Sequence, residues 1–157
     1  MATTRDAEIL ARIRQAFAEC ARPEHFTDYR HCDECAEHDE VLRSRELETL
    51  SMADVGNPGW DPICFVSPEG FRYYLPALAR LALAEPAKPH GWYGPQFFFH
   101  LSYDGPGNVR VMACSGDQRR AVGELLEHIL KTRLELTDSS MCLHEFQRAM
   151  ECWSVKY

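Results

Sequence analysis

A regular stripe of apolar residues marks the first segment of the chain. Its members recur mostly three or four positions apart, which places side chains on one face of an α-helix, and they are Ile9, Leu10, Ile13, Phe17 and Cys20. Thr3 or Thr4 is placed to cap the first turn, and Pro23 follows the end of the stripe. The pattern predicts an amphipathic helix over residues 4–21.

The most apolar segment begins after a clear helix-start signal. Ser67 can accept hydrogen bonds from free amides, Pro68 suits the first helical position, and Glu69 lies near the positive end of the helix dipole. The residues that follow are apolar on more than one side, so we predict a central core helix. Pro76 lies inside it and should kink the helix or split it near Leu75.

Two further helices are predicted in the C-terminal half of the chain. Ser115 and Gln118 have the spacing of a capping box, and a periodic apolar stripe follows them to about Leu134. A last helix, over about residues 140–153, has an apolar face that consists of Leu143, Phe146, Met150 and Trp153.

Residues 97–103 and 109–114 are instead rich in aromatic and β-branched side chains, a composition typical of strands. The five residues between them, DGPGN, are typical of a turn, so we predict a β-hairpin. Together the patterns predict an α+β fold, helix-rich with about five helices and one small hairpin. The length favours a single domain over residues 1–157.

The composition is that of a globular protein. Hydrophobic residues make up 45% of the 157 positions and charged residues 26%, which excludes a largely disordered chain. No apolar run approaches the ~20 residues of a transmembrane helix, and the N-terminal residues lack the apolar core of a secretion signal. The seven cysteines are an odd number, so we predict free or metal-bound thiols in the cytoplasm.

Most of the formal net charge of −7 lies on one segment. From Asp33 to Glu48 there are seven acidic residues against Arg43 and Arg45, a balance of −5. Such a segment repels phosphate backbones, so the predicted partner is a basic protein and not a nucleic acid. The alternative is that these acids only keep a surface helix soluble.

The sharpest chemical signal is HCDECAEHDE at residues 31–40. A helix that starts just after Cys32 would place Cys35 and His38 on one of its faces. Thiolates and imidazoles are the donors that zinc prefers, so Cys32, Cys35 and His38 are the predicted metal ligands. A closed site needs a fourth donor, and the acids are poorer ligands for zinc. The long-range candidates are His25, Cys64, His90, His100 and Cys114.

Other interpretations of these residues stay open. His31 is adjacent to Cys32, and neighbouring side chains rarely face the same ion, so His31 is not a predicted ligand. Cys32 and Cys35 have the spacing of a redox pair, although no strand is predicted before them and the flanking acids would raise the thiol pKa values. Cys32 with His38 or His100 has the residue types of a nucleophile and its base. The cysteines can also be small, half-buried side chains without chemistry.

Three aromatic residues form a second candidate site. Trp60 lies in a stretch rich in glycine and proline, and Trp92 and Tyr93 lie between two glycines. Because Trp and Tyr are enriched in binding hot spots, these residues predict an interaction surface. In the alternative interpretation, the loop aromatics fold back over the core.

The chain resembles a family of small uncharacterised bacterial proteins, a domain of unknown function, in four stretches. These are HCDEC, GNPGWDPICF, SPEGFRYYLPALARLAL and SGDQRRAVGELLEHI. The resemblance covers about residues 8–133, so it leaves out the C-terminal helix, and it implies a single bacterial cytosolic domain without a known activity.

We therefore expect a cytoplasmic binding domain with a structural zinc ion at Cys32, Cys35 and His38. The alternative is a zinc-dependent hydrolase with three protein ligands and a metal-bound water.

Overall fold

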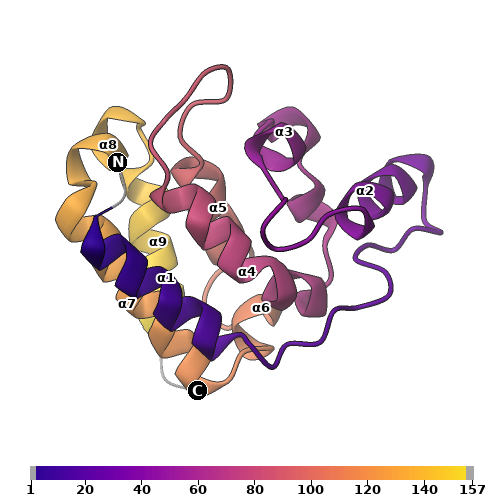
Figure 1. Ribbon diagram of the computed structural model, residues 1–157, viewed down its shortest axis with the longest axis horizontal. Coiled ribbons are helices and arrows are strands. Elements are labelled where there is room, and N and C mark those ends of the chain that lie inside the picture. Colours follow the sequence, from indigo (N-terminus) through magenta and orange to yellow (C-terminus); the bar gives the residue numbers. More distant parts are fainter. Residues whose placement is uncertain (1–2, 155–157) are drawn as a thin grey trace.

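The computed structural model describes residues 3–154, and these residues form a helical fold (Figure 1). The described α-helices are α1 (Thr4–Ala16), α2 (Asp33–Arg43), α3 (Met52–Val55), α4 (Pro68–Leu83), α5 (Gly94–Ser102), α6 (Val109–Met112), α7 (Gly116–Thr132), α8 (Leu134–Ser139) and α9 (Leu143–Ser154). Two 3-10 helices precede α4, and they are η1 (Pro58–Trp60) and η2 (Pro62–Phe65).

No β-strand occurs in the part of the chain that the structure describes, so the predicted α+β class is wrong. The predicted strand over residues 97–103 lies almost entirely in α5, and the one over residues 109–114 begins with α6. The residues predicted as a hairpin turn connect these two helices. Asn108 caps α6 by accepting hydrogen bonds from the amides of Arg110 and Val111.

Burial along α5 gives the physical reason for this difference. Phe97, Phe98 and Leu101 are fully buried, whereas Phe99 is 46% exposed. This is the spacing of one helix face, while a strand would alternate buried and exposed positions. Phe98 packs edge-on against Phe146 of α9, with their ring centroids 5.0 Å apart. Tertiary packing thus overrides the β-propensity of the aromatic run.

Three predicted helix starts are confirmed by their caps. Thr3 forms a capping box with Asp6 at the start of α1. The side chain of Ser67 accepts a hydrogen bond from an amide in the first turn of α4, and Ser115 forms a capping box with Gln118 at the start of α7. Each cap satisfies amides that the helix itself leaves free.

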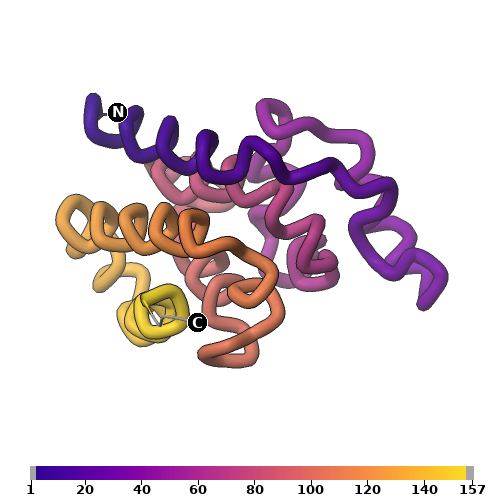
Figure 2. The backbone as a smooth tube through the Cα atoms, turned by 90° about the horizontal axis from the view of Figure 1, so that it is seen from below, coloured from indigo at the N-terminus to yellow at the C-terminus, as the bar shows by residue number. Residues whose placement is uncertain are grey.

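The central helix of the fold is α4, which α1 and α5 contact. It continues through the buried Pro76 to Leu83, so the predicted split near Leu75 is not observed. α1 and α7 run side by side (Figures 1 and 2), and α9 packs against α5 and α7. Figure 1 shows α2 and α3 on the side of the molecule away from α8. Within the described residues, no helix combines the length and the apolar character needed to cross a membrane.

Candidate metal centre

The first turn of α2 brings three metal-binding side chains together. Cys32 is the N-cap of α2, and its Sγ lies 3.4 Å from the Sγ of Cys35. The Nδ1 of His31 lies 3.7 Å from the Cys35 Sγ. One donor atom from each of the three residues lies within 4.8 Å of the other two. We call His31, Cys32 and Cys35 the thiol cluster.

The local backbone explains why two adjacent residues share one site. Cys32 is extended, with φ −164° and ψ 171°, and its Sγ accepts a hydrogen bond from the Cys35 amide at 3.4 Å. His31 belongs to the preceding turn, in which its amide donates to the Asp28 carbonyl at 3.0 Å. Its imidazole therefore reaches Cys35, four residues further on. The expectation that adjacent side chains face different ways does not hold here.

The surroundings of Cys32 favour its thiolate form. A hydrogen bond from the Cys35 amide, together with the His31 and Cys35 side chains, lowers the pKa of Cys32. The hydrogen bond with Cys32 raises the pKa of His31. The hydrogen bond with Cys32, together with desolvation, raises the pKa of Cys35. The positive end of the helix dipole also favours an anion at this position. One thiol is thus prepared to bind a cation, whereas the flanking acids alone would have disfavoured its thiolate.

The spacing of the thiol cluster fits tetrahedral coordination. Zinc–sulfur bonds of about 2.3 Å and zinc–nitrogen bonds of about 2.0 Å put two sulfurs about 3.8 Å apart, and sulfur and nitrogen about 3.5 Å apart. The observed separations are 3.4 Å between the sulfurs and 3.7 Å between the Cys35 Sγ and the His31 Nδ1. Small side-chain rotations are enough to close these differences.

His38, the third predicted ligand, lies elsewhere. Its ring is fully buried, with its centroid 4.6 Å from that of Trp60 and 4.9 Å from that of Phe65. Neither ring nitrogen has a hydrogen-bond partner among the described residues. Burial lowers the pKa of His38, which keeps its imidazole neutral. The structure therefore gathers Cys32 and Cys35 with His31 and not with His38.

Replacing His38 by leucine is expected to leave metal binding intact. The change removes a buried ring whose nitrogens lack partners, which offsets the lost contacts with Trp60 and Phe65. We expect the free energy of unfolding to stay the same or to rise by up to about 2 kcal/mol. Urea denaturation and elemental analysis test the two statements. Loss of bound metal would show instead that His38 is a ligand.

Asp39 holds the segment that leads into the thiol cluster. Its carboxylate is buried and accepts hydrogen bonds from the amides of Phe26 at 2.6 Å and Thr27 at 3.2 Å. The Nδ1 of His25 lies 2.7 Å from the same carboxylate. Burial alone would raise the pKa of Asp39, but His25 and the two amides outweigh it and lower the pKa. This member of the acidic segment is therefore internal and does not contribute to an acidic surface.

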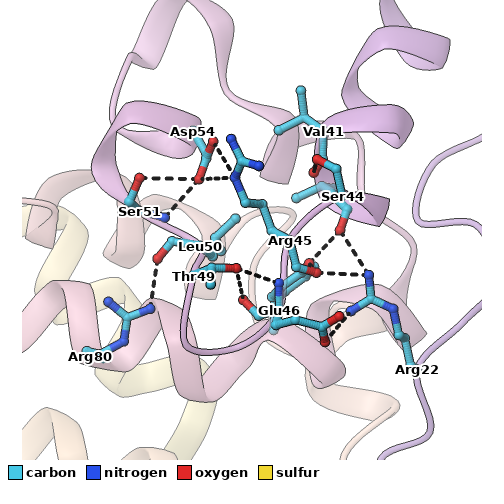
Figure 3. Close-up of polar contacts among 12 residues, drawn as sticks. Arg22, Val41, Ser44, Arg45, Glu46, Thr49, Leu50, Ser51, Asp54 and Arg80 are labelled. Atoms are coloured by element: carbon cyan, nitrogen blue, oxygen red, sulfur yellow. Dashed lines mark hydrogen bonds and ion pairs between the residues drawn. The ribbon is translucent and has the colours of Figure 1, made fainter.

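Polar contacts also fasten the other end of α2 (Figure 3). Arg22 donates to three backbone carbonyls near the end of the helix, those of Leu42, Arg43 and Arg45. The guanidinium of Arg45 pairs with Asp54 at 3.1 Å, and Arg80 donates to the Leu50 carbonyl at 2.7 Å. With both of its ends held, α2 gives the thiol cluster a fixed base.

The predicted interaction aromatics do not form one exposed group. Trp60 is 42% exposed and contacts His38. Trp92 and Tyr93 are buried in the hydrophobic core, and the indole of Trp92 donates to the Ala82 carbonyl at 2.8 Å. The interpretation in which loop aromatics fold back on the core therefore describes Trp92 and Tyr93.

Sequence reasoning did not include His31 among the ligands. Helical spacing does not identify it, because His31 precedes α2 and Cys32, between His31 and Cys35, is extended. None of the long-range candidates belongs to the thiol cluster in the described part of the chain. Cys64 and His100 lie instead in a separate group with Asp61.

Comparison with known proteins identifies a family without an assigned activity. The family model described as a family of unknown function (DUF6714) matches residues 5–154. No curated protein and no solved structure matches the chain. The family match extends from α1 to α9, so it includes the C-terminal helix that the sequence resemblance left out. The chain therefore belongs to this family of unknown function.

Proposed function

We propose that this chain is a metal-binding domain in which His31, Cys32 and Cys35 hold a soft divalent ion, above all zinc. The observation that carries the proposal is that three suitable donors already lie near the separations of a tetrahedral site. Two thiolates and an imidazole suit zinc, whereas calcium and magnesium take oxygen donors.

In this proposal the ion joins the turn before α2 to the first turn of the helix, which is a structural role. Three protein donors leave one tetrahedral position open, and His31 and Cys32 are exposed to solvent. A water molecule fills that position in the isolated protein, and a donor from a partner can replace it. The zinc-dependent hydrolase alternative requires the same open position and, in addition, a general base beside the water.

We keep a basic protein in the cytoplasm as the proposed partner. Three exposed acids lie on α2, and they are Asp33, Glu37 and Glu40. Their negative charge attracts a basic surface toward their side of the helix.

Replacing Cys35 by serine should remove about one zinc ion per chain. Protein purified under reducing conditions without added metal is compared with the variant by elemental analysis. His31→Gln should also lower the metal content, because it removes the nitrogen donor. His144→Gln is the matched control, since His144 is exposed and lies outside the thiol cluster. The proposal fails if Cys35→Ser and His31→Gln both retain the metal content of the parent.

The same geometry favours a second candidate, thiol–disulfide exchange. The Cys32 and Cys35 sulfurs are 3.4 Å apart, and the exposed Cys32 stands in front of the buried Cys35. In this reaction the Cys32 thiolate attacks the disulfide of another molecule and releases one of its thiolates. Cys35 then loses its proton, attacks the mixed disulfide, and releases the second thiolate as the Cys32–Cys35 disulfide forms.

Zinc and a disulfide exclude each other, because each of them uses both sulfurs. Metal-free protein incubated with glutathione disulfide should then lose the mass of two hydrogens, and saturating zinc should prevent that loss. If neither a Cys32–Cys35 disulfide nor a stable mixed disulfide forms, exchange is excluded and metal binding remains.

A further inference from the structure

A second group of metal-binding side chains lies between η2 and α5. Asp61 is the N-cap of η2, Cys64 lies within η2, and His100 lies in α5. One donor atom from each residue lies within 4.8 Å of the other two. We call these three residues the Asp61 cluster. None of them belongs to the thiol cluster.

The carboxylate of Asp61 is held in place from three directions. It accepts hydrogen bonds from the Ile63 amide at 2.9 Å and from the Gln96 side chain at 2.9 Å. The Nε2 of His100 lies 2.7 Å from the same carboxylate. Gln96 is fixed in turn, because it also donates to the Val55 carbonyl at 2.7 Å. Such a network orients a carboxylate and an imidazole before any ligand arrives.

The imidazole of His100 has a nitrogen that nothing in the described structure uses. His100 is 1% exposed, and its Nδ1 is buried without a hydrogen-bond partner. The other ring nitrogen, Nε2, faces the Asp61 carboxylate, so it is the nitrogen that can share an ion with Asp61.

The Asp61 cluster is open to solvent on one side. Asp61, Cys64 and Gln96 line a cavity of about 470 Å³, and the other polar residues of its wall are Ser140 and Glu145. Cys64 is exposed, so its sulfur can be reached from this cavity. Much of the remaining wall is apolar and includes Pro58, Pro95, Phe99 and Met141. A cavity with an apolar wall and a few convergent polar groups is the usual form of a small-ligand site.

We propose that Asp61, Cys64 and His100 bind a second divalent transition-metal ion at the polar wall of this cavity. A carboxylate, a thiolate and an imidazole are donors that zinc and cobalt accept together, while the thiolate disfavours calcium and magnesium. Two anionic donors balance the charge of the ion, and binding releases the Cys64 thiol proton to solvent. Asp61 and Cys64 line the cavity, which would give a small ligand access to the ion.

A nucleophilic role for Cys64 fits the structure less well. Desolvation of the thiol, together with the Asp61 carboxylate, raises the pKa of Cys64 to about 11. A thiol of this kind keeps its proton at neutral pH unless a cation displaces it. The nearest buried cation, Arg110, is occupied by the carbonyls of Ile63 and His100, to which it donates at 2.7 Å and 3.1 Å.

Titration of the reduced 157-residue chain with Co²⁺ tests the Asp61 cluster. Thiolate-bound cobalt absorbs in the near ultraviolet in proportion to the number of cobalt–sulfur bonds. If both clusters bind, the parent takes up two ions, and Cys64→Ser binds one ion fewer and loses about a third of this absorption, because it removes one of three thiolates. Cys142→Ser is the matched control, since Cys142 lines the same cavity but is not in the cluster.

The outcomes separate the Asp61 cluster from the thiol cluster. Loss of one ion in Cys64→Ser but not in Cys142→Ser supports the Asp61 cluster, whether or not Cys35→Ser also loses an ion. Unchanged cobalt uptake and absorption in both Cys64→Ser and Cys64→Ala overturns the second site, even if the thiol cluster binds normally. Circular dichroism of each variant checks that it is folded, as is expected for the two substitutions of the exposed Cys64.

Discussion

Replacing Asp6 by asparagine is expected to lower the free energy of unfolding by about 3 kcal/mol or more. The carboxylate is buried, 3.0 Å from the guanidinium of Arg133 and 2.5 Å from the Nε2 of His128. It also completes the capping box of α1 with Thr3. Without the Asp6 carboxylate, the guanidinium of Arg133 has no negative partner, and it is too buried for water to replace that partner. Arg133 also donates to the Leu83 carbonyl at 2.8 Å, so the change loosens α1, α4 and α7 together.

Asp117 provides the matched control for this substitution. It also pairs with an arginine, Arg12, at 2.9 Å, but its side chain is 54% exposed. We expect Asp117→Asn to change stability far less than Asp6→Asn, because water replaces the lost contact. Equal losses in urea denaturation would contradict the role assigned to the buried Asp6 network.

Asp6 also gives the stability a defined dependence on pH. Burial alone would raise its pKa, but hydrogen bonds from Arg133, His128 and the Thr3 amide hold the pKa well below the usual range. Since its pKa is lower in the folded chain, this contribution is complete above about pH 5 and declines as the pH falls further. The parent should therefore lose stability between about pH 5 and pH 3 more steeply than Asp6→Asn. Parallel pH profiles would exclude this contribution.

Replacing Asp39 by alanine is expected to lower the free energy of unfolding by about 2–4 kcal/mol. The change leaves the buried amides of Phe26 and Thr27 without an acceptor and removes the partner of His25. The loop that carries His31 then keeps the hydrogen bond from the Thr27 hydroxyl to the Cys35 carbonyl but loses its contacts with Asp39. We therefore also expect zinc affinity to fall by about tenfold or more, as when an outer-shell partner of a metal site is lost.

Glu40 is the control for Asp39, since it is the next acid on α2 and is exposed. Glu40→Ala should leave stability nearly unchanged, and zinc affinity is measured for both variants by competition with a chelator. Parent-like stability of Asp39→Ala would show that its hydrogen bonds are not needed for the fold. Parent-like affinity in a folded Asp39→Ala variant would show that the thiol cluster forms without the loop contacts.

Helix starts are predictable here because a cap depends on residues only three positions apart. Ser67 accepts from the Gly70 amide, and Ser115 and Gln118 satisfy each other's backbone. The start of α2 after Cys32 follows the same local logic. Local residues did not predict that α5 is a helix and not a strand, because the aromatic run takes its conformation from the helices packed on it.

Which histidine joins the candidate metal centre depends on which side of α2 is buried. Cys35 and His38 share a face, as their spacing predicts, but that face is turned into the protein. There the ring of His38 packs against Trp60 and Phe65. Both residues lie outside α2, so no sequence pattern within α2 predicts this contact. The Asp61 cluster is still harder to predict, since Asp61 and His100 are 39 positions apart and the expected strand misplaces His100.

The pairing of α1 with α7 has a consequence for synthesis of the protein. The first helix leaves the ribosome with Ile9, Ile13 and Phe17 uncovered, and its partner helix emerges about 100 residues later. At ordinary translation rates this interval is roughly 5–20 s, long compared with the folding of a small helical domain. Until then Arg5, Arg12 and Arg14 keep the nascent helix soluble, and Arg12 meets its partners Asp117 and Glu124 only after α7 has emerged.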